Sequence, residues 1–537
     1  MNAGDTAWVL MSASLVLVMV PGLALFYGGL VSSRNVLVML QQNIFPLGLI
    51  SILWVLAGFS LAFGPDAGGG MIGNLAAFGL RSLAQGPPAG MHVVAPGLAI
   101  PGLAFVAYMM MFAIITPALI TGATADRLKF AGYAVVIGVW SLVVYAPVAH
   151  WLFSPSGWLV RRGAQDWAGG LVVHGSAGAA VVALLVLIGR RRRWPNSATR
   201  PHSIPLVVLG AGLLWFGWFG FNGADGLRAD SVAAQAVINT QVAAAAAMLA
   251  WLLRERFTEG HATVLGSVTG AVAGLATITP CAGFVDTYAA IIIGGLAGVI
   301  CHLALRLKWF LRLDDALDVI AVHFVGGVLG TFLLGFFADK SVNSIGANGL
   351  FYGGGGHLLG EQVLAIVVVV GFSFCMTWII GVTVAKTIGL RVSPADESNL
   401  DQVQEALSAY ALGRPAGVMQ AAGQAVRPLI PAVPATGETK LISALVDHED
   451  ADELRRLLVE AGAVQVVLSE ASLYTQAPRT EMFRGQRRVV EFEPRLRLEV
   501  TAAESDAPRV IQAIKQIAGA ATSLQVIDTR LPEAASS

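Results

Sequence analysis

The chain has 537 residues, of which 55% are hydrophobic and 13% are charged, and its formal net charge is zero. A soluble globular protein carries roughly 25% charged residues, so the composition excludes an ordinary soluble protein. The neutral balance gives no indication of a nucleic-acid partner. Cys281, Cys301 and Cys375 are scattered through apolar segments without the spacing of a metal site or a disulfide framework.

Apolar segments fill the chain up to about residue 390. No charged residue occurs at positions 6–33, 35–65 or 92–125, and each run exceeds the ~20 residues that a membrane-spanning helix needs. The first run is too long for a cleaved signal peptide, and no Lys or Arg precedes it. We expect eleven spanning helices, near residues 6–31, 42–64, 98–123, 129–152, 167–189, 203–222, 232–253, 262–280, 285–305, 315–338 and 360–388.

The basic residues of the loops predict how these helices cross the membrane. The loops after the first, third, fifth, seventh and ninth expected spans hold 13 Lys and Arg residues, whereas the opposite loops hold 5. Because basic loops stay in the cytoplasm, we expect the N-terminus outside and the C-terminus in the cytoplasm. Spans 1–5 and 6–10 look like two copies. Because each copy has an odd number of spans, the second copy enters the membrane from the other side, which makes an inverted repeat. The eleventh span is one further helix.

Two matched pairs of ionisable residues support the duplication. Asp166 lies eight residues before His174, and Asp315 lies eight residues before His323. An ionisable group at membrane depth is costly and is functional by default, although a single histidine could also be a helix–helix hydrogen-bonding group. Each histidine should lie roughly 12 Å from its own face at ~1.5 Å per residue. In a core about 30 Å thick, ~6 Å then separates the two rings, so we expect them to meet.

Five motifs occur in an order that resembles a known family. PGLALFYGGLVSSRNVL, DWAGGLVVH, WFGFNG, ATITPCAGFV and DVIAVH are similar to motifs of the Amt/Mep/Rh ammonium transporter family, over about residues 5–400. The resemblance implies a homotrimer in the cell (inner) membrane, with one narrow pore per subunit for ammonium or ammonia. An enzyme is not expected, because the sequence shows no nucleophile–base set, metal cluster or phosphate loop, and no cofactor is expected either.

The resemblance also implies roles for single residues. His174 and His323 look like the twin pore histidines, and Phe112 and Phe221 look like the stacked rings that close the outer end of the pore. Asp166 looks like the structural aspartate at the outer mouth. An acid at a helix start is usually a cap and a dipole partner, so we expect a structural role for Asp166 in preference to ion binding.

Three further positions concern the ends of the pore. Phe26 occupies the place related by symmetry to Phe221 and is expected near the inner end. Phe153 stands where the family usually has a tryptophan, and Asp225 replaces the usual serine after FNxG. A carboxylate could hold the incoming cation more tightly than a hydroxyl, which suits a sensor better than a fast conductor. Alternatively, Asp225 points to water and is silent.

The chemistry of ammonium explains why such residues suit it. Removing the water of a small cation costs on the order of 20 kcal/mol in a low-dielectric core, whereas a cation–π contact returns only ~0.5–2 kcal/mol per ring. Aromatic rings alone therefore cannot carry the ion across. Neutral imidazoles supply an acceptor and a proton relay in a dry pore. We expect the ion to lose its proton at the outer side, with relay through His174 and His323.

Composition changes after the last expected span. Residues 389–410 resemble the family's C-terminal regulatory segment but lack its His-Gly-Glu core, which puts the usual regulatory contact in doubt. Residues 411–438 are rich in Ala, Pro and Gly and are typical of an extended linker. Beyond them, alternating and amphipathic segments predict a βαββαβ order, which is ferredoxin-like, with residues 471–488 as a long loop. The expected domains are 1–400 (membrane), 401–438 (tail and linker) and 439–537.

Residues 439–530 also resemble the PII signalling proteins, with TEMFRG similar to their T-loop motif. The resemblance implies a regulatory domain that docks on the cytoplasmic pore mouth of its own chain. AGAAT stands in place of the glycine- and lysine-rich phosphate loop, so we predict weak or absent ATP and ADP binding. Two functions stay open: transport regulated by the PII-like domain, and an ammonium sensor that signals through that domain with little transport.

Overall fold

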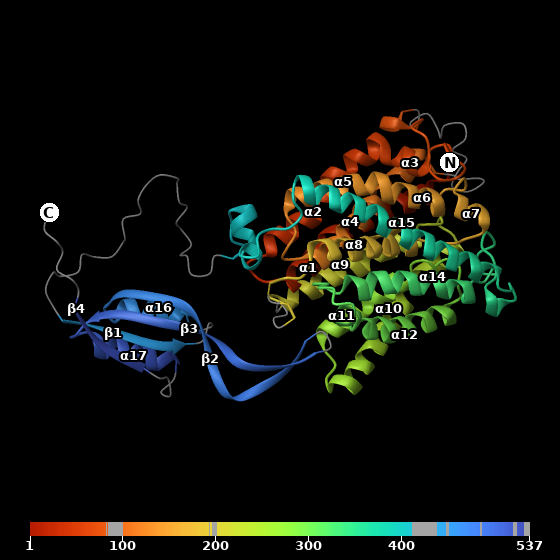
Figure 1. Cartoon of the computed structure of the whole chain (residues 1–537). Helices are drawn as coiled ribbons and strands as arrows, with labels where there is room; N and C mark the ends of the chain where they lie inside the picture. Colours follow the sequence, from red (N-terminus) through yellow and green to blue (C-terminus); the bar gives the residue numbers. More distant parts are fainter. Residues whose placement is uncertain are drawn as a thin grey trace. The chain divides into compact units, whose positions relative to one another are not determined.

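The computed structural model has two compact units, Met1–Tyr410 and Ala411–Ser537 (Figure 1). The structure describes residues 1–81, 83, 100–192, 194–195, 201–410, 438–446, 451–483, 486–518 and 524–530. The expected linker at 411–438 therefore lies almost wholly outside the described residues.

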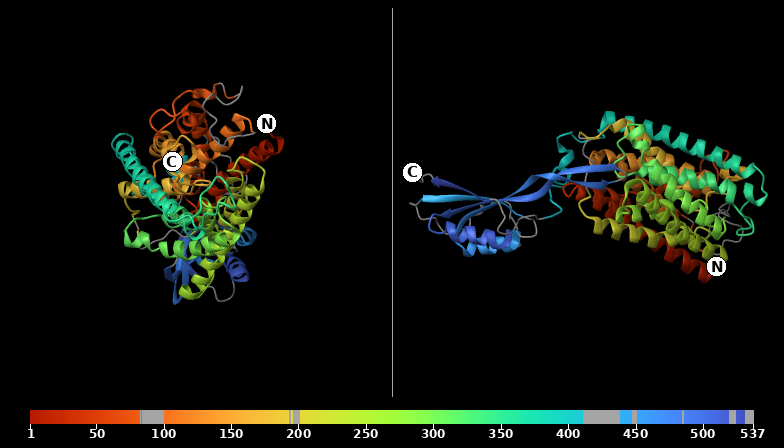
Figure 2. Two further views of the ribbon diagram at one scale, coloured as in Figure 1. Left: turned by 90° about the vertical axis from the view of Figure 1, so that its right-hand side faces the viewer. Right: turned by 90° about the horizontal axis from the view of Figure 1, so that it is seen from below.

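The first unit is a bundle of long apolar helices (Figures 1 and 2). Within the described part of the chain, ten helical stretches are long and apolar enough to cross a membrane, and the segment expected near 262–280 forms a shorter apolar helix. The helices are α1 (Ala3–Leu30), α2 (Val36–Leu53), α3 (Phe59–Phe63), α4 (Gly102–Thr124), α5 (Phe130–Trp140), α6 (Ala146–Phe153), α7 (Trp158–Arg162), α8 (Ser176–Ile188), α9 (Ile204–Gly223), α10 (Ser231–Glu259), α11 (Val264–Ile278), α12 (Thr287–Ala304), α13 (Leu307–Phe310), α14 (Val325–Phe337) and α15 (His357–Thr387).

Several spanning stretches contain a wider, π-helical turn, either between two helices or at the start of one. Such turns are Trp54–Gly58 between α2 and α3, Ser141–Tyr145 between α5 and α6, Gly170–Gly175 before α8 and Ile320–Phe324 before α14. A π-helical turn inserts one residue into the helix and often marks a functional site. Here two of the four turns contain the histidines of the two matched pairs.

The helices α1 and α9, which open the two expected halves, pack closely along each other. Glycines make this approach possible. A Cβ at Gly22 would lie 2.9 Å from Leu213 Cβ, and a Cβ at Gly210 would lie 2.7 Å from Phe26 Cα. Small residues in a membrane helix allow backbones to come together, so α1 and α9 form a tight pair at the contact between the two halves.

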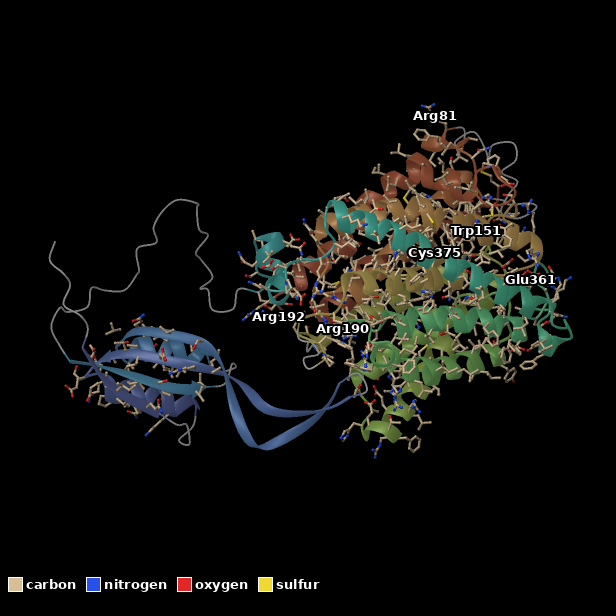
Figure 3. All side chains as sticks on the ribbon, viewed as in Figure 1. Arg81, Trp151, Arg190, Arg192, Glu361 and Cys375 are labelled. Carbon is tan, nitrogen blue, oxygen red and sulfur yellow. The ribbon has the colours of Figure 1, made fainter. Side chains whose placement is uncertain are left out.

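The segment after α15 is docked on the ends of several helices, although it lacks the expected His-Gly-Glu core. Asp401 Oδ1 accepts a hydrogen bond from the Val38 backbone N–H (3.0 Å), and Gln404 Oε1 accepts one from the Phe130 N–H (2.8 Å). Neither α2 nor α5 has a side-chain cap of its own at its N-terminus, so residues of the tail supply both caps. Figure 3 shows Arg190 and Arg192 at this end of the first unit and Glu361 at the opposite end.

The second unit contains four strands and two helices in the order β1 (Glu438–Val446), α16 (Ala451–Glu460), β2 (Ala463–Phe483), β3 (Gln486–Ala503), α17 (Ala507–Ala518) and β4 (Leu524–Arg530). The strands form one antiparallel sheet in the order β2-β3-β1-β4. Its core is a small apolar cluster from the sheet and both helices, which includes Ile442, Leu458, Leu498, Val510 and Ile514.

One expectation for this unit is wrong. Residues 471–488 do not form a loop, because β2 and β3 continue as a long two-stranded hairpin, with residues 484–485 outside the described set. The register shifts between Tyr474 and Arg479, after which Arg479 pairs with Val490 and Phe483 with Gln486. Backbone pairing sustains these strands where the side chains show no apolar alternation.

Candidate functional site

The two histidines of the matched pairs lie against each other in the first unit. His174 Nδ1 and His323 Nδ1 are 3.2 Å apart, and the ring centroids are 5.2 Å apart with an interplanar angle of 18°. Both side chains are buried. At this separation one nitrogen donates and the other accepts, so the two rings share a single N–H between them.

An aspartate fixes the start of each histidine turn. Asp166 accepts hydrogen bonds from the N–H groups of residues 169–172, at 2.6–3.1 Å. Asp315 accepts from Val319 (3.1 Å) and Ile320 (2.7 Å). These carboxylates satisfy N–H groups that a helix start leaves without partners. The bonds place Asp166 in the capping role that its position in the sequence predicts.

Glycines at twin positions let the two histidine turns cross. Gly178 follows His174 by four residues, and Gly327 follows His323 by four. A Cβ at Gly178 would lie 2.6 Å from Phe324 Cα, and a Cβ at Gly327 would lie 2.7 Å from His174 Cβ. Each half therefore leaves out a side chain where the histidine turn of the other half passes.

A small cavity of about 10 Å³ lies against the histidine pair. This volume is near the lower limit for one water molecule, and ammonia is of similar size. Apart from the two imidazoles and the Trp218 indole, its walls are apolar, and that indole N–H donates to Thr279 Oγ1 (2.9 Å). The lining side chains are Met19, Leu23, Ile115, Leu119, Val173, His174, Leu214, Trp218, Phe221 and His323.

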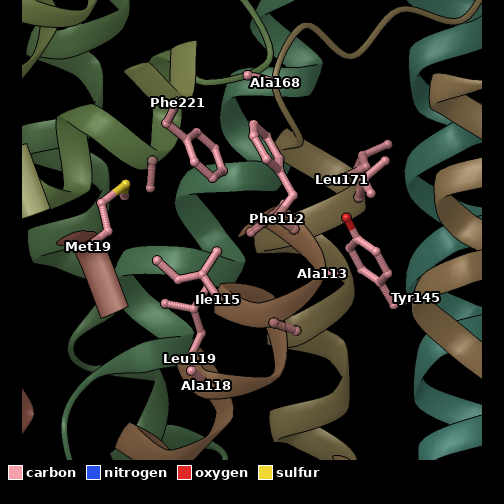
Figure 4. Packing of buried hydrophobic residues seen from close by; sticks show 14 of the residues in the cluster. Met19, Phe112, Ala113, Ile115, Ala118, Leu119, Tyr145, Ala168, Leu171 and Phe221 are labelled. Carbon is pink, nitrogen blue, oxygen red and sulfur yellow. The ribbon is translucent and has the colours of Figure 1, made fainter. Parts of the chain in front are cut away.

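Two phenylalanines face each other next to this cavity, and one of them, Phe221, lines it (Figure 4). Phe112 and Phe221 are stacked, with centroids 4.1 Å apart and an interplanar angle of 14°. Phe153 meets the Phe112 ring edge-on at 6.4 Å. The Tyr108 hydroxyl donates to the carbonyl of Phe221 (2.7 Å) and so fixes the end of α9. Three of the predicted aromatic residues therefore lie together.

The carboxylate of Asp225 lies two residues beyond the end of α9. Asp225 Oδ1 is shielded from solvent and has no hydrogen-bond partner among the described residues, and the same holds for the Tyr145 hydroxyl. Burial, and secondly the charge of Asp166, raise the pKa of the Asp225 carboxyl well above its usual range. Oδ1 of Asp225 is therefore an unused acceptor among the described residues.

The remaining predicted residue, Phe26, does not line the cavity. It is buried on α1, where Met19 and Leu23 line the cavity and Phe26 follows on the same face one turn later. Trp218 is a site residue that the sequence analysis did not single out. Its ring stacks on His174 at 5.5 Å and 19°. Its place three residues before Phe221, on one helix face, was the available signal.

The comparisons with known proteins agree with this site. The sequence model described as Ammonium Transporter Family matches residues 7–410, which end where the first compact unit ends. The chain belongs to this family. An ammonium transporter of Mycobacterium tuberculosis is 44% identical over 432 residues, which cover 76% of this chain and 90% of that protein. One of Bacillus subtilis is 42% identical and covers 76% of this chain and 99% of its own.

Solved structures of the family have the same fold as the first unit of this transporter-family protein. Candida albicans Mep2 is 32% identical with a TM-score of 0.69, covering 75% of this chain and 90% of its own. A protein described as a sensor Amt protein is 30% identical with a TM-score of 0.67, covering 75% and 98%. The relatives are ammonium transporters, so this family member is a multi-pass membrane protein and not an enzyme. These matches leave about a quarter of the chain uncovered.

The twin glycines provide a test of the site's geometry. Replacing Gly327 with alanine should force the histidine turns apart and lower methylammonium uptake by about tenfold or more, because small displacements of reacting groups are costly. Uptake by cells with matched amounts of membrane protein is the measurement. Gly371→Ala on α15 is the control, since nothing lies within 4 Å of its Cβ position. Equal uptake by the two variants would contradict the cross-packing argument.

Proposed function

We propose that this protein conducts ammonium nitrogen across the cell (inner) membrane through the cavity beside His174 and His323. We further propose eleven spans in a 5+5 inverted repeat plus one, an external N-terminus, a cytoplasmic C-terminus and a homotrimer with one pore per subunit. The observation that carries the proposal is the Nδ1–Nδ1 contact of 3.2 Å between the two halves, at the wall of an apolar cavity for one small molecule.

The geometry favours deprotonation over passage of the ion. Ammonium has four N–H donors, and in the cavity they meet two imidazoles and otherwise mostly apolar side chains. These contacts cannot offset a desolvation cost on the order of 20 kcal/mol. Ammonia, in contrast, is neutral and fits the volume. The shared N–H of the histidine pair can move between the rings, which gives the released proton a separate path. In this proposal the substrate crosses as ammonia while its proton passes through the pair.

Replacing both histidines with alanine should therefore abolish ammonium-dependent current in proteoliposomes, because the proton path is lost while the apolar path stays. His150→Ala is a poor control, since His150 is itself buried and bonded to Ala62. His357, at the first residue of α15, is exposed, so His357→Ala is the better matched variant and should conduct normally. An undiminished current in the double variant would rule out the relay.

Asp225 is proposed to bind the incoming cation before it reaches the stacked rings. Its Oδ1 has no partner among the described residues, and an ammonium ion would supply one. Only the ionised carboxylate attracts a cation, and its pKa is raised. Binding should therefore strengthen as the pH rises through that pKa. The Tyr145 hydroxyl is a second proposed acceptor.

The change Asp225→Ser restores the family's usual residue and provides the test. We expect apparent ammonium affinity to fall about tenfold, the effect of losing ~1.4 kcal/mol of binding free energy. We also expect the affinity to lose its rise with pH, because serine has no carboxyl group to ionise. Asp230→Ser is a suitable control, because Asp230 is exposed and caps α10 in place, and serine also caps helices. No change in Asp225→Ser would favour a silent carboxylate.

The second unit is proposed to be a ferredoxin-like, PII-like regulatory domain. Its βαββαβ order and the strand order β2-β3-β1-β4 support this assignment. The long hairpin also supports it, because residues 480–483 of TEMFRG lie near the described end of β2. We propose that it docks on the cytoplasmic mouth of the pore. A tether raises the local concentration to roughly the mM range, so docking needs little intrinsic affinity. The interval that replaces the phosphate loop lies largely in residues 519–523, outside the described residues.

The alternative function is an ammonium sensor that signals through the second unit with little transport. Asp225 favours it, because tight capture slows release, and one structural neighbour is described as a sensor. Growth on limiting ammonium in a cell without its own transporter separates the two functions. A transporter restores growth, and removal of residues 411–537 should then raise the rate if the domain blocks the pore. A sensor restores growth neither with nor without these residues.

A further inference from the structure

The two histidine turns begin with the same unusual backbone conformation but with different residues. Gly169 has a φ of 104° and Asp318 has a φ of 64°. Each lies three residues after the capping aspartate and five residues before the histidine. Glycine adopts positive φ freely, whereas a residue with a side chain does so at a cost. The first half therefore obtains this conformation from glycine, and the second half must stabilise it in another way.

A buried ion pair holds Asp318. The Lys308 ammonium group on α13 contacts Asp318 Oδ1, and both side chains are almost completely buried. Lys308 also lies over the Trp309 ring, 5.5 Å from its centroid. A buried charge is strongly unfavourable without its partner, so the pair fixes the Asp318 side chain, and with it the backbone of residue 318, against α13.

The second turn also has less support from its cap. Asp166 accepts four backbone hydrogen bonds, whereas the structure gives Asp315 two, from Val319 and Ile320. The ion pair therefore acts beside the carboxylate cap to which the structure gives fewer hydrogen bonds.

We propose that Lys308 and Asp318 are positioning residues for the pore: their ion pair holds the left-handed start of the second turn and so places His323 against His174. The inference rests on the proposed function of the histidine pair. Neither residue touches the substrate. Their effect passes through the backbone of residues 318–323, and the side chain of Asp318 does for the second half what the missing side chain of Gly169 does for the first.

The rival explanation is that Lys308 merely neutralises a cluster of buried acids, Asp315 and Asp318. The two explanations differ for variants in which both charges of the pair are removed. Lys308→Met/Asp318→Gly and Lys308→Met/Asp318→Ala carry the same charge and differ by one methyl group. Glycine adopts a φ near 64° freely, whereas alanine does so only at a cost. The positioning role therefore predicts different activities for the two variants, and the charge-neutralising role does not.

Uptake of methylammonium by these variants is the first measurement. Lys308→Met alone should lose about tenfold or more, in line with the cost of a small displacement. The glycine double variant should recover to within about threefold of the unchanged protein, and the alanine double variant should stay low. Equal recovery by both, recovery by neither, or normal uptake by Lys308→Met would each overturn the proposal. The two double variants leave no unpaired lysine, so their comparison stands even if Lys308→Met fails to fold.

A second measurement does not depend on transport. Electron cryo-microscopy of the two double variants reports the distance between the Nδ1 atoms of His174 and His323. The proposal expects about 3.2 Å in the glycine variant, as in the unchanged protein, and a longer distance in the alanine variant. Failure of the histidine relay would appear as current in the variant without both histidines, whereas failure of the positioning role would appear as equal distances here.

Discussion

The contact between two imidazoles from different halves of the chain is the constraint on which the rest of the first unit depends. It requires one atom from each of two helical turns to lie within 3.2 Å of the other. A histidine inside a membrane is costly without a partner, and each ring is a polar partner of the other. The contact therefore gives each ring one polar partner and leaves the cavity beside them apolar.

Meeting this constraint explains the local departures from regular helix. Each histidine lies in a π-helical turn, each turn begins at a carboxylate cap, and each is crossed by the opposite half at a glycine. The halves differ where the start of the turn is stabilised, because one uses Gly169 and the other uses Asp318 with Lys308. The two turns thus share the geometry of the rings, while the residues that support that geometry differ.

The sequence predicted those features that depend on spacing and failed on those that depend on packing. The eight-residue interval from aspartate to histidine led to the prediction that the two rings meet, and they do. Trp218 was missed, because a tryptophan in an apolar helix gives no sign of the ring it stacks on. The Lys308–Asp318 pair was missed because Lys308 resembles any other basic loop residue. The long β2–β3 hairpin was missed because backbone pairing, and not apolar alternation, sustains it.

Asp225 bears on whether the protein transports ammonium or acts as an ammonium sensor. In the proposed function, Asp225 lies on the approach side of the Phe112–Phe221 stack, where it would strengthen capture without adding charge to the cavity itself. Each ~1.4 kcal/mol of extra affinity slows release about tenfold if association is unchanged. Capture before the rings therefore limits the rate of passage, whereas capture beyond them would block it. A transporter tolerates such a group only while release stays faster than proton transfer, and a sensor gains from the opposite order. The chemistry of the site is the same in a transporter and in a sensor. The ratio of the release rate to the proton-transfer rate decides between the two functions.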